Sequence, residues 1–178
     1  MGRNEIRIAG AGGQGVVTAG RILAEAAILS GREATHSQVY GPQSRGGASR
    51  SDVVIATEEI GFPLADNIDL LVVLSGEAYS KYQPELGAHG RLIVDSRCAP
   101  PVSNGAVSLF PVVDTARAIS GGQLVSGVVA LGVLQAHSSV VDAEALRRAV
   151  AARVPAQHRK MNLDALSAGM QLVTEGST

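Results

Sequence analysis

The sequence predicts a single α/β domain over residues 1–178. We expect a doubly wound, mostly parallel, Rossmann-like sheet with helices on both faces and a helical C-terminal third. Short strand-like segments alternate with helical patterns through the first two thirds, as in βαβ units. Residues 6–9 run directly into a glycine-rich turn and then a helix. Residues 69–75 are nearly all apolar, as buried parallel strands tend to be.

The expected elements follow one another along the chain. A helix begins at Val16, shows apolar residues at helical spacing to Ala27, and ends at Gly31. Residues 35–50 form a polar, turn-rich segment, with a second strand ending near Val39. The remaining elements before the C-terminal third are strands over 51–56, 69–75, 91–95 and 107–110, and a helix over 77–86.

The C-terminal third is predicted to be helical. Residues 123–136 are apolar on nearly every side, which places this helix in the core or at a subunit interface. The interface alternative predicts self-association of the isolated chain. Gly127 and Gly132 permit close helix contact, and Asp142 is a candidate N-cap for the next helix. A final helix carries the apolar stripe Leu163, Leu166, Met170 and Val173.

Composition excludes several classes of protein. The net charge is −1, which argues against a nucleic-acid binder. Cys98 is the only cysteine, whereas an iron–sulfur cluster normally takes four thiolates. The four histidines are scattered, so no zinc motif is visible and we expect no metal site. No secretory signal is seen, and the apolar run 124–136 is too short to span a bilayer. We therefore expect a cytoplasmic protein without a membrane partner.

The glycine turn is the first candidate binding site. Gly10, Gly12 and Gly15 fit the G-x-G-x-x-G pattern, which lets a phosphate approach the backbone at a helix N-terminus. Its candidate contact residues are Gly10, Gly12, Gly13, Gln14 and Gly15. A nicotinamide cofactor would also need a carboxylate at the end of the second strand, but Glu33 precedes that strand. In the alternative interpretation the glycines only let the helix pack on the strand, and Gly12 and Gly13 are required by the backbone conformation.

Two sequence blocks carry a family resemblance. Residues 9–24 read AGAGGQGVVTAGRILA, and residues 40–49 read YGPQSRGGAS. In this order and separation they resemble the gamma subunits of 2-oxoacid:ferredoxin (or acceptor) oxidoreductases. The resemblance covers most of the chain and continues through residues 69–74 and 92–95. The form of residues 45–49 is more similar to the 2-oxoglutarate and branched-chain types than to the pyruvate type, where Arg-Gly-Ala-Pro is usual.

The resemblance implies a division of labour. The whole enzyme would convert a 2-oxoacid, coenzyme A (CoA) and oxidised ferredoxin into acyl-CoA, carbon dioxide and reduced ferredoxin. Thiamine diphosphate, magnesium and the iron–sulfur clusters would lie in partner subunits, termed alpha, beta and a ferredoxin-like delta. This chain would bind none of them alone and would not be catalytic alone. A stand-alone nucleotide-binding oxidoreductase and an assembly domain are the alternatives.

The second candidate site is the polar segment around Arg45. Its residues Tyr40, Ser44, Arg45, Gly46 and Gly47 form a possible CoA or interface contact. Arginine between glycines suits a phosphate or carboxylate, because the guanidinium makes paired hydrogen bonds with such groups. The structural alternative is a loop in which Arg45 only pairs with a nearby carboxylate.

Overall fold

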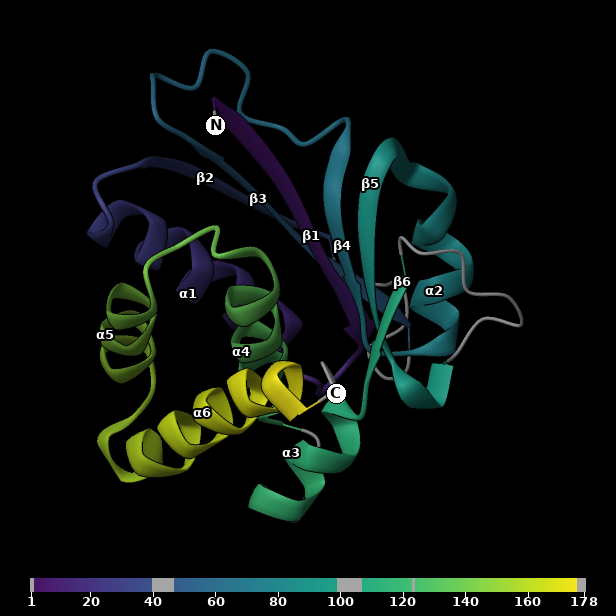
Figure 1. Cartoon of the computed structure of the whole chain (residues 1–178), viewed down its shortest axis with the longest axis vertical. Coiled ribbons are helices and arrows are strands. Elements are labelled where there is room, and N and C mark those ends of the chain that lie inside the picture. The colour runs from purple at the N-terminus through teal and green to yellow at the C-terminus, as the bar shows by residue number, and fades with distance from the viewer. Residues whose placement is uncertain (1, 40–46, 99–106, 123, 176–178) are drawn as a thin grey trace.

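The computed structural model describes residues 2–39, 47–98, 107–122 and 124–175, and its fold is a six-stranded sheet flanked by helices (Figure 1). The strand order is β2-β3-β1-β4-β5-β6. The strands are β1 (Arg3–Ala11), β2 (Glu33–Val39), β3 (Ala48–Ala56), β4 (Ile68–Val73), β5 (Leu86–Asp95) and β6 (Val107–Phe110). The helices are α1 (Val16–Leu29), α2 (Gly76–Tyr82), α3 (Val112–Ser120), α4 (Ser126–Ser138), α5 (Ala143–Arg153) and α6 (Arg159–Glu175).

The sheet is mostly parallel, as predicted, with one reversed strand. β4 pairs in parallel with β1 and β5, and β6 in parallel with β5. β3 runs antiparallel to both of its neighbours, β1 and β2. β2 and β3 are consecutive strands in the chain and neighbours in the sheet, as antiparallel strands often are.

Several boundaries differ from the sequence predictions, among them the start of β5, which is Leu86 rather than residue 91. The second strand ends at Val39 as predicted, but it already begins at Glu33, and β3 begins at Ala48 within the segment expected to be turn-rich. β2 is an edge strand whose residues are half-buried or exposed, so its sequence lacks the apolar alternation that marks a strand. The helix expected over 77–86 ends as α2 at Tyr82 and continues as a 3₁₀ turn containing Pro84. Helix α3 was not predicted.

Helices cover both faces of the sheet, but unequally. α1 packs on β3, β2 and β1, and the larger core joins it to α4, α5 and α6 on that face. α2 covers the opposite face and makes a smaller core with β4 and β5 (Figure 1). Asp142 caps α5 as predicted, because its carboxylate accepts a hydrogen bond from the Ala145 N–H at 2.9 Å.

The apolar helix α4 is buried by its own chain. It packs against α6, α3 and α1, and its residues 126–134 are all buried. At its crossing with α6, a Cβ on Gly132 would overlap the Leu166 carbonyl oxygen, and one on Gly169 would overlap the Val129 carbonyl oxygen. The core alternative is therefore correct, and the reason for expecting self-association through this helix does not hold. In the described part of the chain, no helix is long and apolar enough to cross a membrane.

Candidate functional site

A polar cleft lies at the carboxyl ends of β1, β4 and β5. After β1 the chain turns to α1 on one face, and after β4 it turns to α2 on the other. Ligands of open α/β sheets bind where connections diverge in this way. The cleft has a volume of about 250 Å³. Its lining residues are Ala11, Gln14, Leu74, Ser75, Gly76, Asp95, Arg97 and Cys98.

The glycine turn forms one wall of this cleft, and the Gln14 side chain closes it. Its amide oxygen accepts from the Ala11 N–H at 2.7 Å, and its amide nitrogen donates to the Leu74 carbonyl at 2.9 Å. Gln14 is buried and so ties the end of β1 to the end of β4. A Cβ on Gly10 would lie 2.5 Å from the Gln14 amide oxygen, so Gly10 leaves room for this bridge.

The start of α4 covers the start of α1. The Gly127 N–H donates to the Gln14 carbonyl at 2.8 Å. Gly15 has φ +75°, and a Cβ there would lie 2.7 Å from the Leu124 carbonyl oxygen. Gly13 has φ +89°, which confirms the expected conformational need for glycine at that position. Gly12 is exposed and does not have a positive φ, so its backbone does not show the need that was expected there. Close packing therefore accounts for Gly10 and Gly15 without a ligand.

The nicotinamide interpretation conflicts with the strand order. In the dinucleotide-binding fold the second strand lies beside the first. Here the antiparallel β3 lies between β1 and β2. Glu33 is exposed at the start of β2, at the opposite end of that strand from Val39. The carboxylate that would hold a ribose is thus not brought to the glycine turn.

The floor of the cleft is anchored by Asp95. This residue is 1% exposed, and its carboxylate accepts from the Val113 N–H at 2.8 Å and the Arg97 N–H at 3.2 Å. It thereby fixes α3 to the end of β5. Burial, together with the nearby Asp95 charge, raises the pKa of the half-buried Cys98 thiol. A raised pKa disfavours the thiolate, which agrees with a structural role for Cys98.

The Arg45 segment begins and ends at the same edge of the sheet. Tyr40, Ser44, Arg45 and Gly46 lie outside the described residues, and Gly47 is buried directly before β3. Ala48 pairs with Ala11, so β3 begins beside the glycine turn. Side chains from α2 hold it there. Glu77 accepts from the Ala48 N–H at 3.2 Å, and the Tyr82 hydroxyl donates to the Ala48 carbonyl at 3.4 Å.

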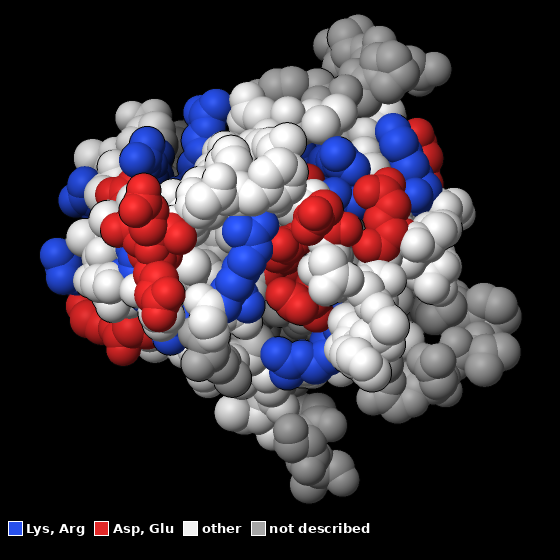
Figure 2. Space-filling view, turned by 90° about the horizontal axis from the view of Figure 1, so that it is seen from above, with Lys and Arg blue, Asp and Glu red and all other residues white. Residues whose placement is uncertain are grey.

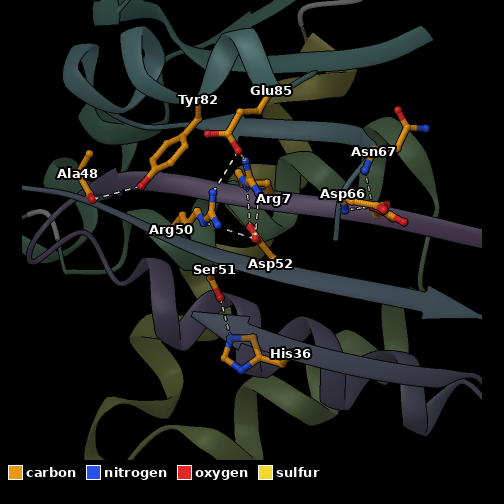
Figure 3. A network of polar contacts seen from close by, with 11 residues as sticks. Arg7, His36, Ala48, Arg50, Ser51, Asp52, Asp66, Asn67, Tyr82 and Glu85 are labelled. Carbon is orange, nitrogen blue, oxygen red and sulfur yellow. Dashed lines mark hydrogen bonds and ion pairs between the residues drawn. The ribbon is translucent and has the colours of Figure 1, made fainter. Parts of the chain in front are cut away.

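A network of charged side chains under α2 was missed by the sequence analysis (Figure 3). Arg7 of β1 makes a paired contact with Asp52 of β3, at 2.7 and 3.0 Å, and a second ion pair with Glu85. Arg50 contacts Glu85 at 3.1 Å, and both guanidinium groups lie over the Tyr82 ring. The available signal was a lone charge inside an apolar strand, with Arg7 between Ile6 and Ile8.

The network keeps Arg7 charged although its side chain is only 2% exposed. Burial alone would lower the pKa of Arg7, but the hydrogen bonds and negative charges of Asp52 and Glu85 outweigh it and raise the pKa. The network thereby joins β1 and β3 to the 3₁₀ turn that follows α2. Its ion pairs hold Arg50 and Asp52 of β3 in place and so stabilise the first part of that strand.

His36 and Ser51 form a separate contact on the α1 face of the sheet (Figure 3). The His36 Nε2 and Ser51 Oγ atoms are 2.7 Å apart, and Ser51 is fully buried. Burial, aided by the charge of Arg21, lowers the pKa of His36. A Cβ on Gly20 of α1 would overlap the Ser51 hydroxyl, so this pair sits at a close approach of helix and sheet. Within the described residues, no three His, Cys, Asp or Glu side chains lie together as metal ligands would.

Fold and cleft together define the class: a Rossmann-like α/β domain whose glycine turn is filled by its own Gln14 and covered by its own α4. The chain belongs to the pyruvate ferredoxin/flavodoxin oxidoreductase family, whose model matches residues 5–172. The family resemblance inferred from residues 9–24 and 40–49 is thereby confirmed.

Relatives and a solved structure match nearly the whole chain. It is 40% identical to the 2-oxoglutarate synthase subunit KorC of Methanothermobacter marburgensis, over 98% of each chain. It is 35% identical to the ketoisovalerate oxidoreductase subunit VorA of Methanothermobacter thermautotrophicus, over 96% of this chain and 36% of that relative. The crystal structure of a keto/oxoacid ferredoxin oxidoreductase gamma subunit from Geobacter sulfurreducens matches with a TM-score of 0.85 at 39% identity, over 98% of each chain.

Proposed function

We propose that the chain is the gamma subunit of a multi-subunit 2-oxoacid:ferredoxin oxidoreductase. The assembled enzyme converts a 2-oxoacid, CoA and oxidised ferredoxin into acyl-CoA, carbon dioxide and reduced ferredoxin. The observation that carries the proposal is the match, at 40% identity and over 98% of each chain, with a 2-oxoglutarate synthase subunit. The gamma-subunit fold of the Geobacter sulfurreducens protein supports it independently.

We assign 2-oxoglutarate as the preferred substrate class of the whole enzyme. Identity falls from 40% with the 2-oxoglutarate synthase subunit to 35% with the ketoisovalerate subunit. The Arg-Gly-Gly-Ala-Ser form of residues 45–49 agrees with this order.

Thiamine diphosphate, magnesium and the iron–sulfur clusters belong, in this proposal, to the alpha, beta and ferredoxin-like delta subunits. Cys98 is the only thiol that the chain could offer to a cluster. The glycine turn is occupied by Gln14 and covered by the start of α4, which favours a partner domain over a free-standing nucleotide-dependent enzyme.

Within the assembled enzyme, the segment around Arg45 is the contact that we assign to this chain. The segment lies between Val39, which pairs with Arg50 of β3, and Ala48, which pairs with Ala11 at the carboxyl end of β1. The start of β3 is held by Glu77 and Tyr82, so the segment leaves the sheet from a fixed point. We propose that Arg45 holds an anionic group, either a CoA phosphate or a partner carboxylate.

The experiment measures the Arg45→Ala variant in the co-expressed complex, with Arg148→Ala as the matched control. Arg148 is an exposed arginine of α5. Loss of one charge-assisted contact costs roughly 1.5–3 kcal/mol. A CoA contact predicts a raised KM for CoA, a partner contact predicts weaker assembly, and a purely structural Arg45 predicts a lower melting temperature only.

The gamma-subunit assignment itself is tested by purification. The tagged chain should bring down thiamine- and cluster-containing subunits with 2-oxoglutarate-dependent ferredoxin reduction. Activity of the purified chain alone with a nicotinamide cofactor would overturn the assignment.

A further inference from the structure

Two large apolar side chains are exposed in the connection between β3 and β4. Phe62, one of only two phenylalanines in the chain, is 52% exposed, and Leu64 is 52% exposed. Single exposed apolar residues are common and need no explanation. Here two of them flank Pro63 in one short segment, in a chain with only 3% aromatic residues.

The backbone of this segment is held at three consecutive carbonyls. Arg3 of β1 donates to the Phe62 carbonyl at 2.8 Å and to the Leu64 carbonyl at 3.0 Å. Thr35 of β2 donates to the Pro63 carbonyl at 2.7 Å. Two strands on either side of β3 thus fix a segment whose side chains are exposed.

Glu5 strengthens this clamp. Its carboxylate accepts from the Arg3 guanidinium at 2.8 Å and from the Asp66 and Asn67 N–H groups at 2.7 and 2.8 Å. Glu5 is only 5% exposed. A buried carboxylate therefore orders both the arginine and the end of the connection. Such order lowers the entropy cost of binding, because the segment need not be immobilised when a partner arrives.

Acidic residues flank the apolar pair. Glu58, Glu59 and Asp66 are exposed in the same connection. The nearby basic group, Arg3, is already committed to Glu5 and to two carbonyls. Figure 2, which looks onto this end of the molecule, shows acidic and basic side chains interspersed with uncoloured surface. A second copy of the chain is a poor occupant, because a symmetric contact here would bring like charges together.

We infer that Phe62 and Leu64 form a docking site for another subunit of the oxidoreductase. The matching surface is an apolar pocket with lysine or arginine at its rim. Aromatic residues, phenylalanine included, are enriched at the buried cores of protein interfaces. This inference rests on the proposed function, since it takes the partner from the same complex. It places a subunit contact at the amino edge of β1, opposite the cleft.

The test is a titration of the full-length chain against the purified remaining subunits. Phe62→Ser combined with Leu64→Ser should weaken the Kd at least ~tenfold, because hot-spot side chains are lost. The matched control is Ile28→Ser, which removes a side chain that is 60% exposed on α1. We expect the control to bind as the wild type does, and both variants to melt close to it.

A second variant tests the charges without touching the apolar pair. Glu58→Lys with Glu59→Lys should weaken binding, and added salt should then strengthen it rather than weaken it. Wild-type-like affinity in both loop variants overturns the inference, as does an equal loss in Ile28→Ser. The wild-type chain could instead form dimers at high concentration that the loop variants abolish. That result would assign the site to a second copy and would also overturn the inference. Failure of the wild-type chain to bind any subunit overturns the proposed function instead.

Discussion

Removing the carboxylate of Asp52 should destabilise the fold strongly. The Arg7 side chain is 2% exposed, and two of its nitrogens bond to Asp52 at 2.7 and 3.0 Å. In Asp52→Ala the guanidinium stays buried with Glu85 as its remaining carboxylate. Breaking a buried ion pair by removing one partner costs about 3–5 kcal/mol. Glu85 is 45% exposed and still contacts Arg7, so we expect the lower end of that range.

Urea unfolding of the isolated chain measures this cost. The matched control is Asp164→Ala, which breaks the exposed pair with Lys160 on α6 and should cost less than about 1 kcal/mol. A loss of 3 kcal/mol is a large part of the ~5–15 kcal/mol that a domain of this size has. If both variants lose the same small amount, the network does not support β3 and the reasoning from its burial is wrong.

Three further outcomes follow from the same structure. Gly169→Ala should lower the free energy of unfolding by about 1–3 kcal/mol, because its Cβ would overlap the Val129 carbonyl, as urea unfolding would show. Gly13→Ala should cost about 1–2 kcal/mol at φ +89°, whereas Gly76→Ala, with open space around it, should be neutral in the same assay. Hydrogen bonds from Asn67 and Arg3 overcome the opposing effect of burial and lower the pKa of Glu5 from its usual 4.5. Its stabilisation is therefore complete above 4.5 and is lost as the pH falls through the lower folded-state pKa, so acid unfolding curves of Glu5→Gln should show a weaker pH dependence in that window.

Patterns of residues adjacent in the sequence predicted those strands, turns and caps that depend on sequence neighbours. The apolar run 69–75 gave β4, and the strand, turn and helix around Gly10 and Gly15 appear as expected. Asp142 caps α5, because an N-cap needs only a side chain and the backbone three residues on. The end of β2 at Val39 was predicted, but its start at Glu33 and the start of β3 at Ala48 were not, since pairing with other strands decides where a polar strand begins.

The candidate site was predicted in part. The glycine turn was located correctly, but its contents were not, because Gln14 bonds to Leu74, sixty residues away. The cover provided by Leu124 and Gly127 likewise depends on a helix from the far end of the chain. The charged network of Arg7 and Asp52 joins three separate elements and was not anticipated.

The sequence by itself determined the fold class, the family and the position of the turn, because these depend on periodicity and on two short blocks of residues. Only the tertiary structure decided that β3 lies between β1 and β2, and that α4 is buried in its own chain. It also decided that Arg3 and Glu5 hold the connection carrying Phe62. The physical reason is common to all three. Each depends on contacts between segments far apart in the chain, whose energies are set by burial and pairing that no local pattern encodes.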